Sequence, residues 1–339
     1  MSKPTDFAYY LTKYLSNYLP GTMGASHNTV ASYKDTFKLF LSFASDTRNL
    51  KPEKITLDTF NRDLVLDFLC WIEEERECTV QTRNLRLTAC HAFFRFIQTQ
   101  EPKLLLKCQE ILDIRKKKTG QATVNFLSPE GIKLLLQQPV PTSSSGMKHQ
   151  ILLTFMYATA CRVQEAVDAI IMDFKFNGNN LVRLTGKGEK SRFIPLEPQI
   201  IKLIERYLEE RKKEKLFSIN APLFVNHSGN KLTRQGVTVI LKKYIEAARK
   251  VRSELIPEHF SPHGLRHSRA IHWLQSGVDL IYIRDLLGHV SVQTTEVYAR
   301  IDGEMKRKAL EKVSPSSYPD SLPVWQSDQS LLEWLKAFK

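Results

Sequence analysis

The sequence has no long apolar run, few cysteines, and fewer acidic than basic residues. No stretch approaches the roughly 18–20 consecutive apolar residues of a membrane-spanning helix. The first residues, MSKPTDFAYY, lack the basic-then-apolar pattern of a signal peptide. These absences argue against a membrane or secreted protein. We therefore expect a soluble cytoplasmic protein without a membrane partner.

Cysteine is scarce, and the spacing of the cysteines does not match that of a metal site. The five cysteines are odd in number, form no Cys-x-x-Cys pair, and lie in apolar, helix-like surroundings. This usage argues against a disulfide framework and against a zinc knuckle. We predict no metal site and reduced core thiols at Cys70, Cys78, Cys90, Cys108 and Cys161.

The deficit of acidic residues leaves a strong positive charge. The chain has 49 Lys and Arg against 36 Asp and Glu, a formal charge of +13. Residues 1–120 contribute 18 basic and 14 acidic residues and the remainder 31 and 22, so no short basic tail explains the excess. Such a charge favours a polyanionic partner such as nucleic acid. An ordinary soluble basic protein is the alternative.

The length predicts two domains, because 339 residues exceed what one hydrophobic core usually supports. A basic run, Arg115–Lys118, lacks apolar periodicity and reads as a linker whose cations can lie on phosphate. We place a helical domain over 1–114, the linker over 115–124 and a second domain over 125–313. Residues 314–339 are expected to form a flexible connector and a terminal helix.

The first domain is predicted to contain four helices. The first covers about 6–18 and stops at Pro20-Gly21, the second opens at the N-cap Ser26, and the others cover about 63–77 and 80–99. The apolar faces of the second and fourth consist of Val30, Phe37, Leu41 and Ala44, and of Leu85, Ala89, Ala92, Phe93 and Phe96.

The opposite faces of these two helices are polar or basic, which suits contact with a DNA backbone. An ordinary solvated face is the alternative. The DNA-binding candidates are Thr29, Ser32, Tyr33, Thr36, Asn84, Thr88, His91 and Arg95, with Arg115, Lys116, Lys117 and Lys118 of the linker.

The second domain is predicted to be mainly α-helical with a small β-sheet. Short β-prone runs at 181–185 and 192–196 flank a glycine-rich hairpin tip, and a small strand is expected at 223–225. Helices are expected from Ser128, over about 198–215 and 233–251, and from His263 almost to Lys312 with breaks at Gly277 and 289–291. The terminal helix at 329–339 has an apolar face that needs a partner surface, in its own chain or in a neighbouring subunit.

Five separated segments carry residues suited to phosphate chemistry. They are Ala160-Cys161-Arg162-Val163-Gln164-Glu165, Gly186-Lys187-Gly188, His263-Gly264-Leu265-Arg266-His267, Leu286-Leu287-Gly288-His289, and Thr294-Thr295-Glu296-Val297-Tyr298. Their order of Arg, Lys, His-x-x-Arg, His and Tyr resembles that of the tyrosine recombinases, the phage-integrase family. The Arg-x-Ile-Pro-Leu run after the hairpin and the tyrosine nine residues beyond the Leu-Gly-His turn are also similar to that family.

The resemblance implies a SAM-like four-helix core-binding domain, an α+β catalytic domain, and site-specific cutting and rejoining of double-stranded DNA without a cofactor. Tyr298 would attack the phosphate to form a 3′-phosphotyrosyl link. Arg162 and Arg266 would hold the phosphate oxygens, Lys187 would protonate the leaving 5′-oxygen, and His263 and His289 would assist. Glu165 and His267 would support these groups.

The same resemblance implies a homotetramer on DNA, formed from monomers or weak dimers, with strand exchange through a Holliday junction. It implies a nucleoid-associated location and a use in integration, excision or transposition of a mobile element, with accessory recombination proteins left open. Thr-Ala-Cys precedes Arg162 where Thr-Gly-Leu is more usual, and the segment after Tyr298 is rich in serine and proline. The second departure leaves the regulation of the nucleophile undefined.

Alternatives remain at this level. A type IB topoisomerase uses the same chemistry without pairing two sites, and an idle DNA-binding architectural protein would retain only the fold. Lys190 is the rival of Lys187 on the same hairpin. His263 and His267 are spaced to hold zinc on a helix, although no third ligand is evident.

Overall fold

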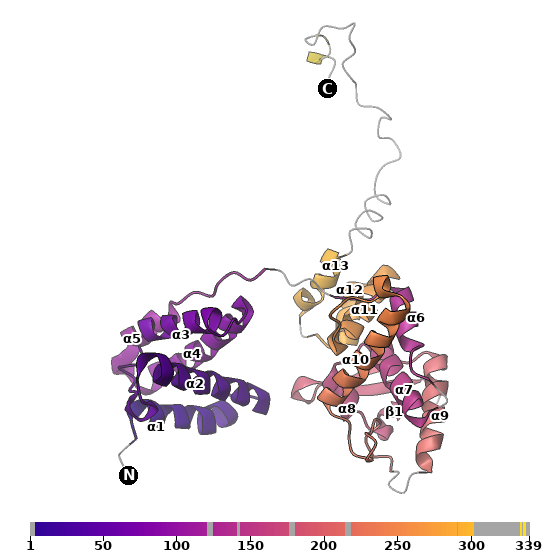
Figure 1. Cartoon of the computed structure of the whole chain (residues 1–339), viewed down its shortest axis with the longest axis horizontal. Helices are drawn as coiled ribbons and strands as arrows, with labels where there is room; N and C mark the ends of the chain where they lie inside the picture. The colour runs from indigo at the N-terminus through magenta and orange to yellow at the C-terminus, as the bar shows by residue number, and fades with distance from the viewer. Residues whose placement is uncertain are drawn as a thin grey trace. The chain divides into compact units, whose positions relative to one another are not determined.

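The computed structural model describes residues 4–120, 125–140, 143–175, 180–213, 218–289, 291–301, 333, 335 and 336. Of Ser144, Lys187, Arg300 and Ile301 it describes the backbone only. The chain divides into two compact units, Met1–Ala122 and Thr123–Lys339 (Figure 1). The connector predicted at 314–328, and the terminal helix apart from 333, 335 and 336, lie outside the described residues.

The first unit is built of helices. They are α1 (Asp6–Lys13), a π-helix that continues it (Tyr14–Thr22), α2 (His27–Arg48), α3 (Arg62–Glu74), α4 (Val80–Gln100) and α5 (Leu105–Leu112), with 3₁₀ turns at Pro52–Lys54 and Pro102–Leu104. Side-chain oxygens of Ser26, Asn61 and Thr79 accept hydrogen bonds from first-turn N–H groups of α2, α3 and α4. These caps explain where the three helices begin, and the predicted start after Ser26 is confirmed.

Two features of this unit differ from the prediction. The first helix does not stop at Pro20-Gly21 but continues through Thr22 as a π-helix that contains Pro20. Proline clashes with the carbonyl of the preceding turn in an α-helix, and the π-helical turn has a different hydrogen-bond pattern there. The sequence analysis also did not anticipate α5, which packs against α4.

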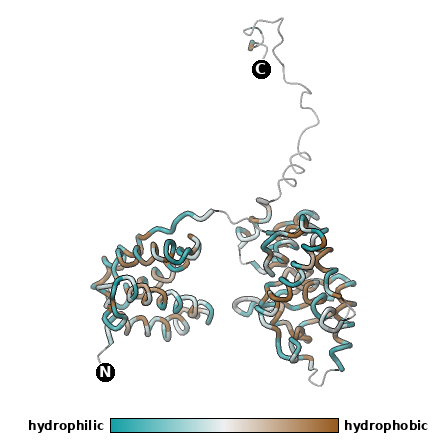
Figure 2. Tube along the Cα trace, viewed as in Figure 1, coloured by the Kyte–Doolittle hydropathy of each residue, from teal (hydrophilic) through white to brown (hydrophobic). Residues whose placement is uncertain are grey.

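Aromatic side chains form the core of the first unit. Phe40 and Phe60 stack with ring centroids 4.0 Å apart, and Phe7 meets Phe60 and Phe93 edge to face at 5.4 and 5.9 Å. Brown and teal segments alternate along the helices in Figure 2, as expected when one side of each helix is buried. Burial of these large rings supplies most of the driving force for packing the helices.

The prediction that polar side chains face outward on α2 and α4 is wrong at two positions. Thr36 is fully buried, donates a hydrogen bond to Ser32 O and accepts one from Arg86 Nη1 at 3.0 Å. His91 is buried, with its Nε2 at 3.1 Å from the carbonyl oxygen of Ile111 at the end of α5. Leu85, predicted to be buried, is 49% exposed. Ala89, Phe93 and Phe96 are buried as predicted, and α5 covers His91 as well, so the buried face of α4 is wider than predicted.

The second unit combines helices with one small sheet. The helices are α6 (Pro129–Leu136), α7 (Ser144–Thr159), α8 (Val163–Asp168), α9 (Pro198–Lys212), α10 (Arg234–Val251), α11 (Pro262–Gln275), α12 (Leu280–Leu287) and α13 (Glu296–Ile301). The strands β1 (Phe174–Lys175), β2 (Leu181–Thr185) and β3 (Ser191–Pro195) form an antiparallel sheet in the order β1-β2-β3. Residues 223–225, predicted as a strand, make only an isolated bridge between Val225 and Lys231.

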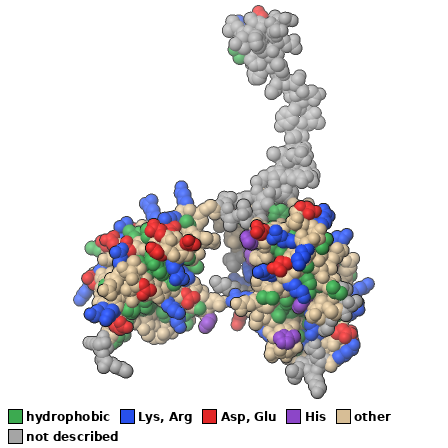
Figure 3. Space-filling model, viewed as in Figure 1, with side chains coloured by type: hydrophobic (Ala, Val, Ile, Leu, Met, Phe, Trp, Pro, Cys, Tyr) green, Lys and Arg blue, Asp and Glu red, His purple; other side chains and the backbone are tan. Residues whose placement is uncertain are grey.

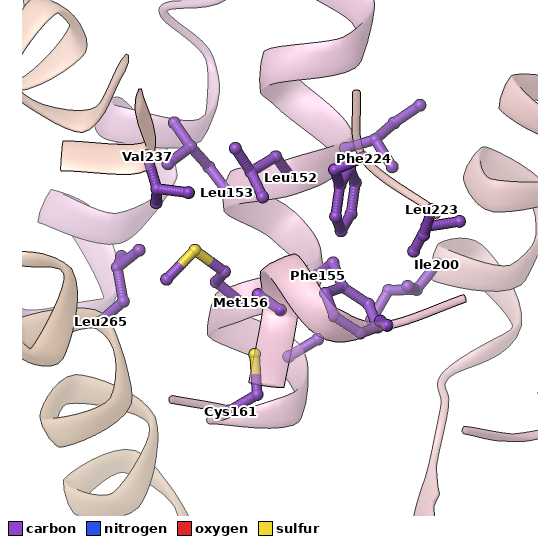
Figure 4. Packing of buried hydrophobic residues seen from close by; sticks show 14 of the residues in the cluster. Leu152, Leu153, Phe155, Met156, Cys161, Ile200, Leu223, Phe224, Val237 and Leu265 are labelled. Carbon is purple, nitrogen blue, oxygen red and sulfur yellow. The ribbon is translucent and has the colours of Figure 1, made fainter. Parts of the chain in front are cut away.

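Helix α7 lies at the centre of the second unit and packs against α9 and α11. Figure 4 shows its Leu152, Leu153, Phe155 and Met156 among side chains from several other elements, including Ile200 of α9, Val237 of α10 and Leu265 of α11. Close packing around α7 fixes where its C-terminal end lies, and that end leads directly into the segment containing Arg162. The predicted fold class, mainly α with a small β-sheet, is confirmed.

All five cysteines are free thiols. Cys90, Cys108 and Cys161 are buried, as predicted for core thiols, whereas Cys70 is exposed and Cys78 is half-buried. Burial raises the pKa of the Cys161 thiol to about 12, so this neighbour of Arg162 stays protonated. The prediction of a core thiol is wrong for Cys70, because this residue lies on the outer side of α3.

Candidate active site

The residues predicted to carry the chemistry come from five elements of the second unit. Arg162 immediately precedes α8, Lys187 lies in the turn between β2 and β3, and His289 follows α12. Three more, His263, Arg266 and His267, lie on α11, and Tyr298 lies on α13. Only the backbone of Lys187 is described, and the adjacent Gly186 lies against the Arg162–Glu165 pair, where an added Cβ would meet Glu165 Oε1 at 3.0 Å.

Arg266 is the most buried of these groups, with no exposed surface. Its Nη1 donates to the carbonyl oxygen of Ala160 at 2.8 Å, and its Nη2 donates to that of Leu287 at 2.7 Å. Ala160 ends α7 in the left-handed region, with φ of 48°, and Leu287 is the last residue of α12. Burial, with the nearby charge of Arg162, lowers the pKa of Arg266 to about 10, so the side chain remains a cation at neutral pH.

Arg162 and Glu165 form an ion pair at the start of α8. Arg162 Nη1 donates to Glu165 Oε1 at 2.8 Å, and the Arg162 backbone N–H donates to Glu165 Oε2 at 2.8 Å. The Glu165 side chain is 2% exposed, whereas that of Arg162 is 38% exposed. The arrangement anchors one edge of the Arg162 guanidinium and leaves the side chain partly open to solvent.

Glu165 is held by a second arginine, Arg192 of β3. Its Nη1 and Nη2 donate to Glu165 Oε1 and Oε2 at 2.9 and 2.8 Å. Burial opposes ionisation of Glu165, but hydrogen bonds and positive charge from Arg192 and Arg162 outweigh it, so its pKa lies below the usual value. Sequence reasoning missed Arg192 as a site residue, although its Arg-x-Ile-Pro-Leu run was part of the resemblance.

Three histidines surround the arginines in an uncharged state. Burial, with the charges of neighbouring groups, lowers the pKa of both His267 and His289 to about 4. The pKa of His263 is also lowered, by burial and by the charges of Arg266 and Arg162. His289 Nδ1 lies 2.9 Å from Thr295 Oγ1. At neutral pH these rings can exchange hydrogen bonds or accept a proton, but they add no positive charge.

We predict that His267 and His289 titrate near pH 4 in the free protein, well below the ordinary value of about 6.5. Because protonation then favours the unfolded chain, stability should fall as the pH drops from about 6.5 toward about 4. NMR titration of the imidazole rings, assigned with His→Gln variants, measures the midpoints, and urea unfolding measures the stability. A midpoint above 6 for either ring contradicts the proposed environment.

Tyr298 is buried in the wall of the site, with 1% of its surface exposed. Its hydroxyl lies 2.9 Å from His267 Nδ1, and its ring packs in a cluster with Ala270, Ile271 and Leu287. Burial raises the pKa of Tyr298, while the charges of Arg266 and Arg162 act to lower it. The hydroxyl is therefore protonated at neutral pH and hydrogen-bonded to a neutral histidine.

The two parts of the chain match two profiles of one family. The Phage integrase family profile matches residues 125–305, and the profile of the Phage integrase N-terminal SAM-like domain matches residues 11–101. The chain belongs to the phage integrase family. The predicted class, a tyrosine recombinase that transfers DNA strands, is thereby confirmed, as is the pairing of a SAM-like helical domain with a catalytic domain.

Relatives of this integrase are similar over most of their length. A Sinorhizobium fredii protein with the provisional name integrase/recombinase y4rC is 31% identical over 99% of this chain and 100% of its own. The tyrosine recombinase XerC of Herpetosiphon aurantiacus is 32% identical over 85% of this chain and 89% of its own.

Solved structures share the fold at lower identity. A XerH site-specific recombinase bound to a palindromic difH substrate has a TM-score of 0.67 and 23% identity, covering 85% of this chain and 80% of its own. The Tn1549 transposon integrase in complex with transposon right end DNA has a TM-score of 0.71 and 16% identity, covering 91% of this chain and 99% of its own. Both similarities concern the fold.

The DNA-binding candidates of the integrase's first unit differ in exposure. Arg95 and the four linker cations are exposed, whereas Thr29, Ser32, Tyr33, Asn84 and Thr88 are half-buried. The Asn84 amide is bound to the backbone of Lys117, whose ammonium pairs with Glu73 at 2.7 Å. In Figure 3, Lys and Arg side chains are interspersed with Asp and Glu on the visible face of each unit.

Two further features bear on the alternatives. Among the described residues of the integrase, no group of three or more His, Cys, Asp or Glu gathers as metal ligands would. The rings of His263 and His267 meet edge to face, with centroids 4.3 Å apart. In the same part of the chain, no helix combines the length and apolar character needed to cross a membrane.

Proposed function

We propose that this tyrosine recombinase cuts and rejoins double-stranded DNA with Tyr298 as the nucleophile. The observation that carries the proposal is geometric: Arg266 binds the carbonyl oxygens of Ala160, two residues before Arg162, and of Leu287, two residues before His289, at 2.8 and 2.7 Å. The Tyr298 hydroxyl lies 2.9 Å from Nδ1 of His267, the residue next to Arg266. Side chains from α8, α11, α13 and the turn after α12 therefore share one site. Opening a phosphodiester without a metal requires such a set, with a nucleophile, cations for the phosphate and a proton donor for the leaving group.

The proposed step balances without a cofactor. The Tyr298 oxygen forms a bond to phosphorus and gives its proton to one of the neutral histidines of the site. The bond from phosphorus to the 5′-oxygen breaks, and that oxygen takes a proton from Lys187. A 5′-hydroxyl of a second strand reverses the step at the 3′-phosphotyrosyl link. The 3′-phosphotyrosyl link conserves the energy of the broken phosphodiester bond, so no ATP is consumed.

The arginines serve as the phosphate clamp. A guanidinium presents parallel N–H donors and stays charged, which suits the non-bridging oxygens of a phosphate. Arg162 is partly exposed and contacts the phosphate directly in this proposal, whereas Arg266 is buried and adds positive charge from inside the protein. His263 and His289 donate hydrogen bonds to the phosphate, and His267 holds the nucleophile through its hydroxyl. Because Tyr298 is 1% exposed, attack requires a movement of α13 that brings its hydroxyl to the phosphate.

At the level of the assembly, we propose that four copies pair two DNA sites and exchange strands in two steps through a Holliday junction. The biological use proposed is integration, excision or transposition of a mobile element. The full-length similarity to a Sinorhizobium fredii protein with an integrase/recombinase name supports this use. The positive charge of the chain, +13, supports contact with DNA beyond the scissile phosphate.

Trapping of a covalent intermediate tests this function. The full chain is incubated with a pool of duplex oligonucleotides of randomised sequence, and protein that remains attached after denaturation is recovered. Sequencing identifies the selected site, which is then prepared with a nick beside the cleavage point so that the released fragment diffuses away. We expect a stable adduct in which a 3′-phosphate is joined to the peptide containing Tyr298.

Three outcomes are distinguished. An adduct on a selected site, with strand exchange between two such sites, supports the recombinase. Strong relaxation of a supercoiled plasmid that lacks the selected site indicates a type IB topoisomerase instead. A protein that binds the selected duplex but never becomes attached to it overturns the enzymatic proposal and favours an architectural DNA-binding protein.

A further inference from the structure

Arg192 connects three segments that carry the proposed catalytic groups. It lies on β3, directly after the turn that contains Lys187. Its two Nη atoms bind both carboxylate oxygens of Glu165 at 2.9 and 2.8 Å, and its Nε donates to the carbonyl oxygen of Leu286 at 2.7 Å. The side chain is 12% exposed, so all three bonds lie largely away from water.

The first contact acts on Arg162. Glu165 binds Arg162 through its Oε1 and through the backbone N–H, and Glu165 is itself fixed by both prongs of the Arg192 guanidinium. A carboxylate held at both oxygens cannot rotate freely, so it holds Arg162 in one orientation. Two arginines sharing one buried carboxylate thus have different roles, because Arg162 is 38% exposed at the site and Arg192 lies behind it.

The second contact acts on the turn that leads to His289. Arg192 binds the carbonyl of Leu286 in the last turn of α12, and Gly288 follows with φ of 64°. A Cβ on Gly288 would lie 3.1 Å from Arg192 Nη1 and 3.2 Å from its Cδ. The absence of a side chain at residue 288 therefore lets the turn pack directly against the arginine. This contact fixes the position of His289, the next residue.

We propose that Arg192 is a positioning residue that aligns the Arg162 guanidinium, the His289 turn and the Lys187 hairpin on one phosphate. The inference rests on the proposed function and assigns to Arg192 no contact with DNA. Lysine cannot replace it fully, because the three bonds require the planar fork of a guanidinium together with its Nε. Misplacement of catalytic groups by about 1 Å typically costs about a hundredfold in rate.

The test compares Arg192→Gln and Arg192→Lys with matched variants of Arg183. Arg183 lies on the neighbouring strand β2 and also binds a carboxylate through two nitrogens, at 2.9 and 2.8 Å from Asp173 Oδ1, but does not touch Glu165. The rate of adduct formation on the nicked site, the affinity for that DNA and the urea unfolding midpoint are measured for each full-length variant. We expect adduct formation to slow about a hundredfold in Arg192→Gln and about tenfold in Arg192→Lys, with DNA affinity within about twofold of the natural protein.

A pH profile separates positioning from a merely structural role. The charged groups around Glu165 are Arg162, Arg192 and, farther away, Arg266. Removing Arg192 takes away the largest contribution that lowers the Glu165 pKa, so the acid limb of the cleavage rate should shift to higher pH in Arg192→Gln. Guanidinium ion added at low concentration should restore part of the rate in Arg192→Ala. Neither effect is expected for Arg183→Gln.

The outcomes keep this inference separate from the proposed function. If the natural protein forms no adduct, the proposed function fails. If it forms the adduct and Arg192→Gln matches its rate and pH profile, the positioning role is overturned. Should Arg192→Gln fail to fold, Arg192→Lys decides, and a rate and pH profile equal to those of the natural protein overturn the inference.

Discussion

Tyr298→Phe is expected to fold and bind DNA like the natural protein and to form no covalent adduct with it. The substitution removes one hydroxyl and leaves the ring in its buried cluster with Ala270, Ile271 and Leu287. The lost hydrogen bond to His267 should cost about 1 kcal/mol of unfolding free energy. No other group replaces the nucleophile, so the loss of adduct should be complete. Gel analysis after denaturation measures it directly.

Tyr282→Phe is the matched control. Tyr282 lies on α12 and is 67% exposed, so its hydroxyl is accessible to solvent yet has no place in the proposed site. We expect this variant to form the adduct at the natural rate. An adduct that persists in Tyr298→Phe, or that maps to a peptide containing another tyrosine, would show that Tyr298 is not the nucleophile.

Substitution of Arg266 should have the largest combined effect on activity and stability. In Arg266→Met, the buried carbonyls of Ala160 and Leu287 lose their donors, and unfolding free energy should fall by about 3 kcal/mol. Loss of the buried charge should also slow adduct formation about a thousandfold. Arg266→Lys keeps a charge but cannot bind both carbonyls with the same geometry, so it should recover stability better than rate.

The control for Arg266 lies one turn along the same helix. Arg269 pairs with Glu197 at 2.7 Å and lies over the rings of Tyr157 and Trp273, away from the proposed phosphate contacts. Arg269→Lys should leave the rate of adduct formation unchanged. Urea unfolding and single-turnover trapping, measured on the same preparations, separate lost stability from lost chemistry. A natural rate in Arg266→Met contradicts the role proposed for the buried arginine.

Sequence patterns predicted the helices and strands that are determined by residues close together in the chain. Ser26 caps a helix as its side chain and position indicate, and the run at 181–185 forms β2 as its β-prone residues indicate. The order of arginine, histidine and tyrosine segments pointed to the family before any geometry was available. These features depend on residues a few positions apart, or on short motifs that can be recognised in the sequence alone.

Features set by distant packing were not predictable in this way. His91 has the spacing of a polar face, yet it is buried because α5 covers it and offers the Ile111 carbonyl. Arg192 opens the Arg-x-Ile-Pro-Leu run, but the sequence does not show its partners, which come together only where β3, α8 and α12 meet. Pro20 is a reliable signal for ending an α-helix, but the chain continues past it with another hydrogen-bond pattern.

Because two arginines share the single carboxylate of Glu165, the site carries a net positive charge. Arg162, Arg192 and Arg266 bring three positive charges, Glu165 brings one negative charge, and the lowered pKa values keep His267 and His289 uncharged. The remainder is two positive charges. A phosphodiester brings a single negative charge, whereas the five-coordinate phosphorus formed during attack carries two. In the proposed reaction the Lys187 ammonium adds a third positive charge. The site as a whole would then attract the doubly charged five-coordinate phosphorus more strongly than the singly charged phosphodiester, so that the attraction grows as the bond to Tyr298 forms.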